Sequence, residues 1–447
     1  MAAAGFAMIG IFMALVMSKK VIPLVAFTVV PLAFAVCTGY GAKAGDFIVD
    51  SLEHLAPVVA LLTFAILYFS IMTDAGLFDP VIRNVLTLTG NDPLKIVVGT
   101  AVLGLAVSLD GDGTSTTLVV VGAFLPLYRR LGMRVVNLLC VLMLATTSTN
   151  LTPWGGPTAR VAVALRVDPH DVLLRMIPVM AVMVLSTLGI AAFLGLRERR
   201  RLKWSPDAAL ARSDVGGTSG PGTPAQPRIE IDTGELLGNS ATARPQLFWF
   251  NAALTIALLV ALISQLTAAP VLFMAAFAIG LLVNFPTPAQ QRERLDAHAP
   301  TLLSVITMML AAGVLTGVLT GTGMIEAMAK TLVAIVPQSM EGHLGPVLAV
   351  MALPAQFFLS VDAYYFGLVP VLGEVAAQHG VTALEAASAS LLGGPVHALS
   401  PLVPAVILVA GLTGVEIGEM LRVNLKWAIL MSFIAMAAAF ALGIVPL

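Results

Sequence analysis

The chain alternates long apolar runs with short polar gaps, and the runs are close to the length of membrane-crossing helices. A helix needs about 20 predominantly apolar residues to cross a bilayer, and several runs are shorter than this. The runs fall at about 2–17, 21–37, 55–72, 94–107, 117–128, 135–148, 153–165, 173–196, 247–267, 270–284, 301–319, 344–359, 363–377, 384–411 and 425–446. The pattern predicts an all-α polytopic membrane protein with about ten spans and further segments that do not cross.

The short runs occur in pairs, which predicts two kinds of interrupted segment. Two pairs indicate re-entrant hairpins, at about 93–130 and 343–378, that enter and leave on one side of the membrane. Two others indicate single helices broken by glycine and proline, at about 135–166 and 383–412. Broken backbone at membrane depth is tolerated only inside protein or beside a cavity. These four segments are therefore the expected place of a site.

Basic residues predict which side each loop faces, because cytoplasmic loops carry an excess of Lys and Arg. A re-entrant first hairpin that enters from inside puts the following residues in the cytoplasm: Lys19, Lys20, Arg83, Lys95, Arg129, Arg130, Arg134, the basic cluster of 197–203, Arg292 and Arg294. The N-terminus is then outside, and Asp46, Asp50 and Glu53 lie in an outer loop. Arg166 and Arg175 are also outside and count weakly against the layout.

The chain divides into two similar parts. Residues 197–245 are rich in Gly, Pro, Ser and Thr and predict a disordered cytoplasmic linker between a first repeat, 1–196, and a second, 246–447. Thr73–Asp79 resembles Thr320–Glu326, and two further motifs recur in the same way. Because the copies start on opposite sides, they form an inverted repeat, and paired interrupted segments in such repeats point to a midplane binding site.

Composition excludes an ordinary soluble domain. The chain is 58% hydrophobic and 11% charged, with a mean hydropathy of +0.95 and a net charge of −1. No nucleic-acid-binding patch is visible. Cys37 and Cys140 lie in apolar runs and suggest neither a disulfide nor a thiolate metal site. The first apolar run lacks a basic region before it, so we expect a retained span.

The tip of the first hairpin, Ser108-Leu-Asp-Gly-Asp-Gly-Thr114, carries two carboxylates in an apolar setting. Charged groups at membrane depth usually face water, an ion or a partner charge. Ser108, Asp110, Asp112 and Thr114 offer oxygen ligands that suit a hard cation or a proton. The alternative is that the acids only cap the second hairpin helix, but one cap needs a single acid.

The first helix break offers neutral hydrogen-bonding groups and exposed backbone. The candidate residues here are Ser148, Thr149, Asn150, Thr152, Gly155, Gly156 and Arg160. Pro157 starts the next half-helix, whose N-terminal end attracts a carboxylate. Arg160 faces two alternatives: it pairs with an anionic substrate, or it pairs with Asp110 or Asp112.

The second half repeats both features. Its hairpin tip contains Ser360, Asp362 and Tyr364, with Tyr365 beside them; a tyrosine pair at the membrane interface is the rival interpretation for the tyrosines only. Its helix break contains the candidates Gly393, Gly394, His397 and Ser400. His397 is either a proton carrier near neutral pH or a packing residue.

At these motifs the chain resembles the CitMHS family of citrate–metal:proton symporters. The matching segments are 68–80, Ser108-Leu-Asp-Gly-Asp-Gly-Thr114 and Asn150-Leu-Thr-Pro-Trp-Gly-Gly-Pro-Thr-Ala-Arg160. The resemblance implies uptake of citrate chelated to a divalent metal, driven by protons, in the bacterial cytoplasmic (inner) membrane. It also implies the ion-transporter superfamily fold: a homodimer with a scaffold domain and a transport domain that moves as an elevator.

The resemblance also suggests how roles are divided among the site residues. Asp110, Asp112, Asp362 and His397 become the candidates for proton coupling, and Asp110 and Asp112 for contact with the metal of the complex. The metal arrives as part of the substrate, and no resident cofactor is implied. Sodium-coupled relatives use Ser-Asn-Thr motifs at both tips. This chain has acids there, which favours protons over sodium.

Other functions remain as alternatives. A different organic-anion permease or a cation/proton antiporter would use the same fold. An intramembrane hydrolase with Ser108 or Ser360 as nucleophile would not require an acidic motif in both inverted halves, so we expect no enzyme. A channel is disfavoured because two hairpins that close on one site are typical of alternating access.

Overall fold

The computed structural model describes residues 1–18, 20–111, 113–204, 242–334, 343–400 and 403–446. Within these ranges every regular element is a helix, which confirms the predicted all-α class. Asp112 and most of the predicted linker lie outside the described residues.

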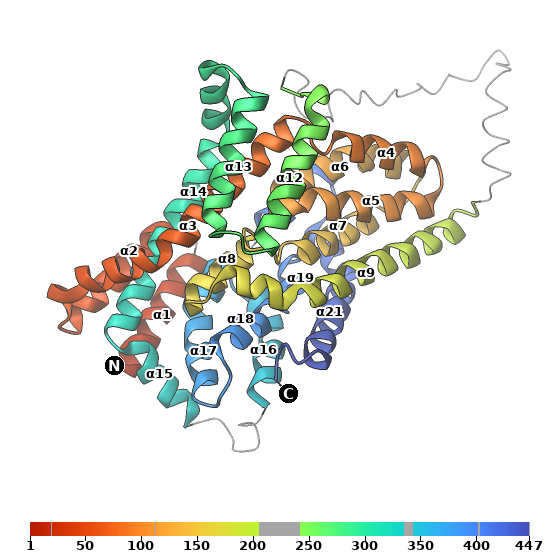
Figure 1. Cartoon of the computed structure of the whole chain (residues 1–447). Helices are drawn as coiled ribbons and strands as arrows, with labels where there is room; N and C mark the ends of the chain where they lie inside the picture. The colour runs from red at the N-terminus through yellow and green to blue at the C-terminus, as the bar shows by residue number, and fades with distance from the viewer. Residues whose placement is uncertain (19, 112, 205–241, 335–342, 401–402, 447) are drawn as a thin grey trace, which may run out of the picture.

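The first half runs from two apolar helices through a hairpin and a broken helix to one long helix (Figure 1). Its elements are α1 (Ala2–Met17), α2 (Pro23–Cys37), η1 (Gly41–Lys43), α3 (Ala44–Asp74), α4 (Asp79–Thr89), α5 (Pro93–Val107), η2 (Ser108–Asp110), α6 (Gly113–Arg130), α7 (Val135–Thr149), α8 (Gly156–Leu165) and α9 (Pro169–Arg201).

The second half follows the same order of elements. They are η4 (Pro245–Leu247), α12 (Phe248–Ile263), α13 (Ala269–Asn284), α14 (Pro288–Gly321), α15 (Met324–Val333), α16 (Leu344–Phe358), η6 (Ala363–Leu368, a π-helix), α17 (Val369–Ala377), α18 (Ala383–Leu391), α19 (Gly394–His397), α20 (Pro404–Thr413) and α21 (Ile417–Ala441). The pairs α5–α6 and α16–α17 lie in the ranges predicted for the hairpins, and α7–α8 and α18–α20 lie in those predicted for the broken helices. That the hairpins are re-entrant stays a prediction. The repeat boundaries and the inverted orientation of the halves stay predictions.

Six helices in the described part of the chain are long and apolar enough to cross a membrane. They are Gly41–Asp74, Pro93–Asp110, Pro169–Arg201, Pro245–Ile263, Pro288–Gly321 and Ile417–Ala441. Shorter apolar helices, including α1, α2 and α13, supplement them. The chain is thus a multi-pass membrane protein, with fewer full-length spans than the apolar runs alone suggest because several runs form short helices.

Three Asp-Pro pairs in the sequence, Asp79-Pro80, Asp92-Pro93 and Asp168-Pro169, are typical of an N-cap followed by proline at the first helical position. Two of them start helices in this way. Asp92 accepts a hydrogen bond from the Leu94 amide (3.0 Å), and Asp168 accepts one from the His170 amide (2.8 Å). Such N-caps satisfy amide groups that the first helical turn leaves unpaired. Asp79 is an exception: Phe78 is the N-cap, and Asp79 already belongs to α4.

Two polar segments that were expected to be loops are helical. The predicted outer loop with Asp46 and Asp50 is the first part of α3, where an acid in the first turn favours the helix N-terminus. The helix α9 continues to Arg201, five residues beyond the predicted end of the first repeat. Glu198 is buried there and accepts hydrogen bonds from Asn137 (2.9 Å) and Arg201 (2.7 Å), which stabilises the extension.

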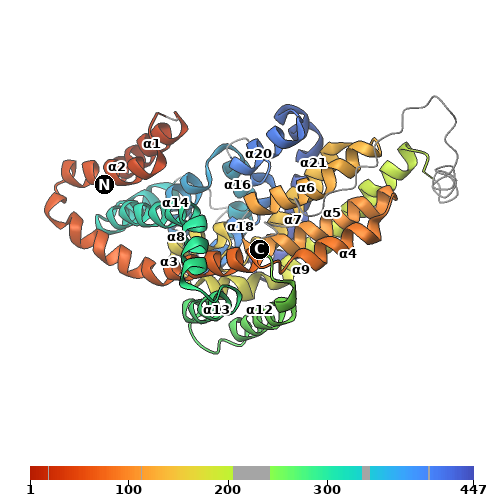
Figure 2. The ribbon, with the colours of Figure 1, turned by 90° about the horizontal axis from the view of Figure 1, so that it is seen from above.

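The long helices α3 and α14 pack against each other and against α13 and α2, while α9 packs against α5, α7 and α21. Figure 2 shows α1 and α2 at one end of an elongated molecule and α4 and α5 at the other. At the α3–α14 crossing, a Cβ on Gly317 would lie only 2.6 Å from the Phe47 carbonyl oxygen. Glycine is therefore required for this close approach.

The two arginines that count against the predicted sidedness both have acidic partners. Arg166 lies 3.7 Å from Asp50, and Arg175 lies 2.9 Å from Glu385. The positive-inside bias counts Lys and Arg and is not a net-charge rule, so these pairings do not remove the objection. The sidedness itself stays a prediction.

Candidate functional site

The first hairpin tip is a sharp turn that only glycine permits. The chain leaves η2 through Gly111, which has a φ of +82°, and a Cβ at this residue would lie 3.1 Å from the Trp154 carbonyl oxygen. Left-handed backbone and close contact both favour glycine. Ser108 and Asp110 beside it are buried, as the sequence predicts for residues of a site.

The first tip is held directly against the first helix break. The Trp154 indole donates to the Leu109 carbonyl (2.8 Å), and the hydroxyls of Ser108 and Thr149 hydrogen-bond to each other. The first contact satisfies a backbone carbonyl at the tip. The two hydroxyls also donate to carbonyls of their own helices, Ser108 to Gly104 (2.6 Å) and Thr149 to Ala145 (3.3 Å). Two segments separated in sequence thus form one unit.

Asp110 is oriented within the first tip. Its Oδ2 accepts a hydrogen bond from the Ser115 hydroxyl at 2.6 Å. A short bond of this kind is typical of a carboxylate acceptor. The second predicted acid, Asp112, lies outside the described residues, so its place relative to Asp110 stays a prediction.

The first break exposes polar atoms inside the protein. A Cβ on Gly155 would lie 2.2 Å from the Asn150 carbonyl oxygen, so this residue must be glycine. Asn150 Oδ1 and Thr152 Oγ1 are buried and have no hydrogen-bond partner among the described residues. Buried polar atoms without partners need a water, an ion or a ligand. Gly156 begins α8, whose first-turn amides face this region.

Ser148 does not belong to this polar group. Its hydroxyl donates to the Leu144 carbonyl (2.7 Å) and contacts the Thr187 hydroxyl on α9 (3.0 Å). The side chain therefore joins α7 to α9.

Arg160 connects the two halves of the protein. Its Nε donates to Asp362 Oδ1 at 2.7 Å, and its Nη1 donates to the Gly156 carbonyl at 3.0 Å. Both partners of the ion pair are about four-fifths buried, with side-chain exposures of 20% and 17%. The sequence offered Asp110 or Asp112 as acidic partners for Arg160, but the structure pairs it with the acid of the second tip.

The second tip differs from the first in its backbone. Ser360 Oγ accepts a hydrogen bond from the Ala363 amide (3.2 Å), and the chain then continues as the π-helix η6. The π-helical turns often mark functional segments. Tyr364 is fully buried, and its hydroxyl donates to the Ser390 carbonyl (3.3 Å) on α18. This contact joins hairpin to broken helix and leaves the predicted substrate contact of Tyr364 without support.

The second break is held to the second hairpin much as the first break is held to the first. His397 Nδ1 hydrogen-bonds to the Gln356 carbonyl (2.8 Å), and the Ser400 hydroxyl donates to the Phe357 carbonyl (2.8 Å). Both carbonyls belong to the last turn of α16, which a helix leaves without internal partners. A Cβ on Gly393 would lie 2.7 Å from the Ala352 carbonyl oxygen of the same helix.

Two cavities meet at Arg160 and Gly156. The central cavity, of about 230 Å³, lies among the tips and breaks; its lining includes Gly113, Thr114, Thr147, Asn150, Arg160, Val361, Gly394 and His397. The inner cavity, of about 360 Å³, lies between this unit and the long helices α3 and α14; its lining includes Asp74, Asp110, Ser115, Trp154, Gly156, Arg160, His298 and Thr301. Both halves therefore contribute to one polar region.

The polar region offers many neutral donors and few net charges. In the described part of the chain, no three His, Cys, Asp or Glu side chains gather closely enough to hold a metal ion. Arg160 is paired with Asp362, so it adds no excess positive charge. Such a region suits a small, oxygen-rich and weakly charged ligand.

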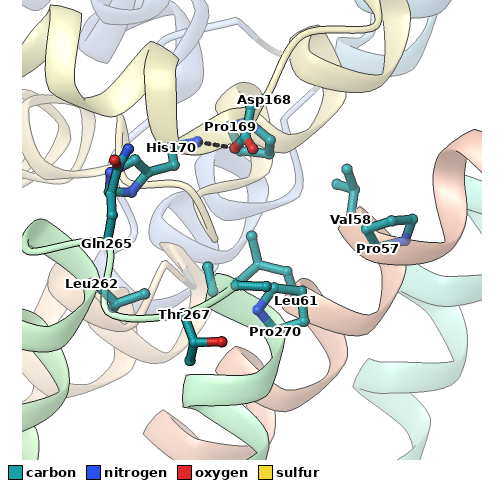
Figure 3. A pocket seen from close by; sticks show the side chains of 12 residues that line it. Pro57, Val58, Leu61, Asp168, Pro169, His170, Leu262, Gln265, Thr267 and Pro270 are labelled. Carbon is teal, nitrogen blue, oxygen red and sulfur yellow. Dashed lines mark hydrogen bonds between the residues drawn. The ribbon is translucent and has the colours of Figure 1, made fainter.

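A third and larger cavity, of about 400 Å³, contains none of the predicted site residues (Figure 3). It lies between α3, the start of α9 and the loop that joins α12 to α13. Its carboxylate, Asp168, caps α9 by accepting from the His170 amide. Size alone therefore does not identify the site.

Sequence reasoning missed several residues of this region. Trp154 and Gln356 join hairpins to broken helices, and Asp74 and His298 line the inner cavity. Trp154 lies within the candidate motif of the first break. A buried indole N–H usually has a hydrogen-bond partner, so this group could have indicated a contact with another segment. His298 lies in a polar stretch before an apolar run, where nothing local indicates a cavity.

Comparison with known proteins identifies the family of the chain. A family model described as "Citrate transporter" (CitMHS) matches residues 7–393. The chain belongs to the CitMHS citrate transporter family. This confirms the resemblance seen in its motifs. The family is described as one of citrate transporters, so the chain is a transporter and not an enzyme.

Three curated relatives from Bacillus subtilis (strain 168) match nearly the whole chain. A "Citrate transporter" is 43% identical over 99% of this chain and 98% of its own length. A "Mg(2+)/citrate complex secondary transporter" is 40% identical over 99% and 98%. An "Uncharacterized transporter YraO" is 35% identical over 99% of both chains.

The fold is also that of a solved transporter. The YdaH transporter of Alcanivorax borkumensis, described as having an unusual topology, superposes with a TM-score of 0.59 at 15% identity. The match covers 91% of this chain and 89% of that one. It shows that the chain shares the fold of that transporter.

Proposed function

We propose that this CitMHS protein is a secondary transporter that imports citrate as a complex with a divalent metal ion, coupled to protons. The observation that carries the proposal is the Arg160–Asp362 ion pair, which joins the first break to the second tip in the wall shared by two cavities. The relative named as a transporter of the Mg(2+)/citrate complex, at 40% identity, supports the same substrate class.

The charge of the region favours the complex over free citrate. Citrate is a trianion near neutral pH, and a divalent cation leaves the complex with a single negative charge. The one arginine shared by the cavities is already paired, and Asp110 adds a negative charge. Amides of α8 and the side-chain amide of Asn150 supply donors for a weakly charged anion.

The metal belongs to the substrate in this proposal. Magnesium and similar hard cations are commonly held by one or two carboxylates together with oxygens of the ligand itself. Asp110 is the candidate for contact with the metal of the complex among the residues that the structure describes. Asp112, which lies outside them, is the second candidate. Citrate supplies the remaining oxygens.

Protons are the proposed coupling ions. Asp110, Asp362 and His397 are ionisable groups inside the apolar part of the molecule, and such groups typically serve substrate or proton pathways. Asp112 is the fourth candidate. Their protonation would lower the negative charge of the region when the anionic cargo binds.

The movement that we propose is of the elevator type. The helices α3, α13 and α14 form one packed group. The two hairpins, each with the broken helix that it contacts, form two hairpin units, and these pack against α9 and α21. The first group would be the scaffold in a homodimer in the bacterial inner membrane, and the second would carry the cargo across.

The direct test is uptake of labelled citrate into proteoliposomes with Mg²⁺, Ca²⁺, Zn²⁺ or EDTA outside, at two pH values. We expect at least one metal to raise uptake about tenfold over EDTA, and an inward proton gradient to raise it further. Equal uptake in EDTA would contradict the metal complex and favour another organic-anion permease. Citrate-independent exchange of cations for protons would favour an antiporter.

A further inference from the structure

The inner cavity has a second polar wall, which belongs to the two long helices and not to the hairpin units. His298 on α14 and Asp74 at the end of α3 both line the cavity. His298 Nε2 lies 2.8 Å from Asp74 Oδ2, and Arg294 Nη1 lies 3.4 Å from the same oxygen. The side chains of His298 and Asp74 are 22% and 21% exposed. The pair is largely enclosed and faces the cavity.

The pairing fixes what the imidazole ring can offer to the cavity. An ionised carboxylate only accepts hydrogen bonds, so His298 Nε2 must be the donor to Asp74. In the neutral ring Nδ1 is then an acceptor, whereas in the charged ring Nδ1 becomes a second donor. The ring therefore presents a donor to a ligand carboxylate only when it is protonated.

His298 is placed on the surface of α14 that looks toward the hairpin unit. His298, Thr301 and Val305 follow one another at helical spacing along the cavity wall, and Arg160, Asp110 and Ser115 line the cavity from the other side. The charged groups around the ring are Asp74 from α3, Arg294 with its partner Glu293 from α14, and Asp110 and Arg160 across the cavity.

We propose that His298 is a cargo-binding residue contributed by the long helices at the inner mouth of the pathway. In its protonated form it donates Nδ1–H to a carboxylate of the metal–citrate complex. Loss of that proton to cytoplasmic water removes the donor and releases the cargo. Asp74 positions the ring by accepting a hydrogen bond from its Nε2. The inference rests on the proposed function and on the predicted cytoplasmic location of this end of α14.

The test uses inverted membrane vesicles, which expose the cytoplasmic face, and measures the KM for Mg²⁺–citrate in citrate exchange between pH 6 and pH 8. We expect the wild-type KM to rise about tenfold over this range as the histidine loses its proton. His298→Gln keeps a polar side chain that does not titrate, so its KM is expected to rise much less over this range than that of the wild type. The maximal rate should change much less than the KM.

The matched control is His379→Gln, because His379 hydrogen-bonds only to the Val375 carbonyl (2.9 Å) on its own hairpin among the contacts described. This variant should keep the wild-type pH profile. Asp74→Asn should raise the KM at pH 6, because the ring loses the carboxylate that fixes its orientation.

A wild-type pH profile in both His298→Gln and Asp74→Asn would overturn the inference. Absence of citrate exchange by the wild type with each of Mg²⁺, Ca²⁺ and Zn²⁺ would instead overturn the proposed function. The two failures are thus distinguishable in one set of vesicles.

Discussion

Replacement of Arg160 by Gln is expected to lower citrate uptake by about 100-fold or more. The substitution leaves Asp362 largely buried without its partner, and breaking a buried ion pair costs about 3–5 kcal/mol. It also removes the bond that joins the first break to the second tip. Uptake by proteoliposomes with a fixed amount of folded protein measures the effect.

A double variant separates the structural role of the pair from its role in transport. Arg160→Gln with Asp362→Asn removes both charges, so most of the lost stability should return. We expect its thermal unfolding to be close to that of the wild type while uptake stays low. Arg166→Gln is the control, because this arginine pairs at 3.7 Å with Asp50, an exposed partner away from both cavities. Restored uptake in the double variant would assign the pair to stability alone.

Gly393→Ala is expected to reduce the amount of folded protein severely. The added Cβ would lie 2.7 Å from the Ala352 carbonyl oxygen and 2.7 Å from Gln356 Nε2, so the second break would have to separate from α16. Overpacking of a tight contact costs about 1–3 kcal/mol, and here one of the clashing atoms is backbone. The fraction of monodisperse protein after detergent extraction measures the loss.

The neighbouring Gly394→Ala provides the matched folding control, because a Cβ there meets nothing within 4 Å. Its yield of monodisperse protein should be close to that of the wild type. Equal yields for the two alanine variants would show that the second break does not depend on its contact with α16.

The hairpins and breaks were predictable because the sequence marks them locally. Runs such as Asp110-Gly-Asp-Gly113 interrupt an apolar pattern, and Asp92-Pro93 and Asp168-Pro169 mark the starts of helices. These signals act over a few residues, so they can be read without knowledge of the tertiary structure.

Contacts between the halves were not predictable in the same way. Arg160 and Asp362 are 202 positions apart, and several acids were plausible partners until the fold selected one. His298 lies in a polar stretch that begins a helix longer than its apolar run, so its place beside a cavity depends on how α14 packs against α3. The start of α3 was predicted to be a loop for the same reason, because its packing against α14 cannot be read from the local sequence.

The claim that cargo binds where the two tips meet is tested most directly by cysteine protection. In a background with Cys37 and Cys140 replaced by Ala, Thr114→Cys from the first tip and Val361→Cys from the second both place a thiol in the wall of the central cavity. Leu118→Cys, one turn from Thr114 on an exposed position of α6, is the control. We expect Mg²⁺–citrate to slow maleimide labelling of both cavity thiols and not of the control. Protection at one tip alone, or at neither, would contradict a single site built from both halves.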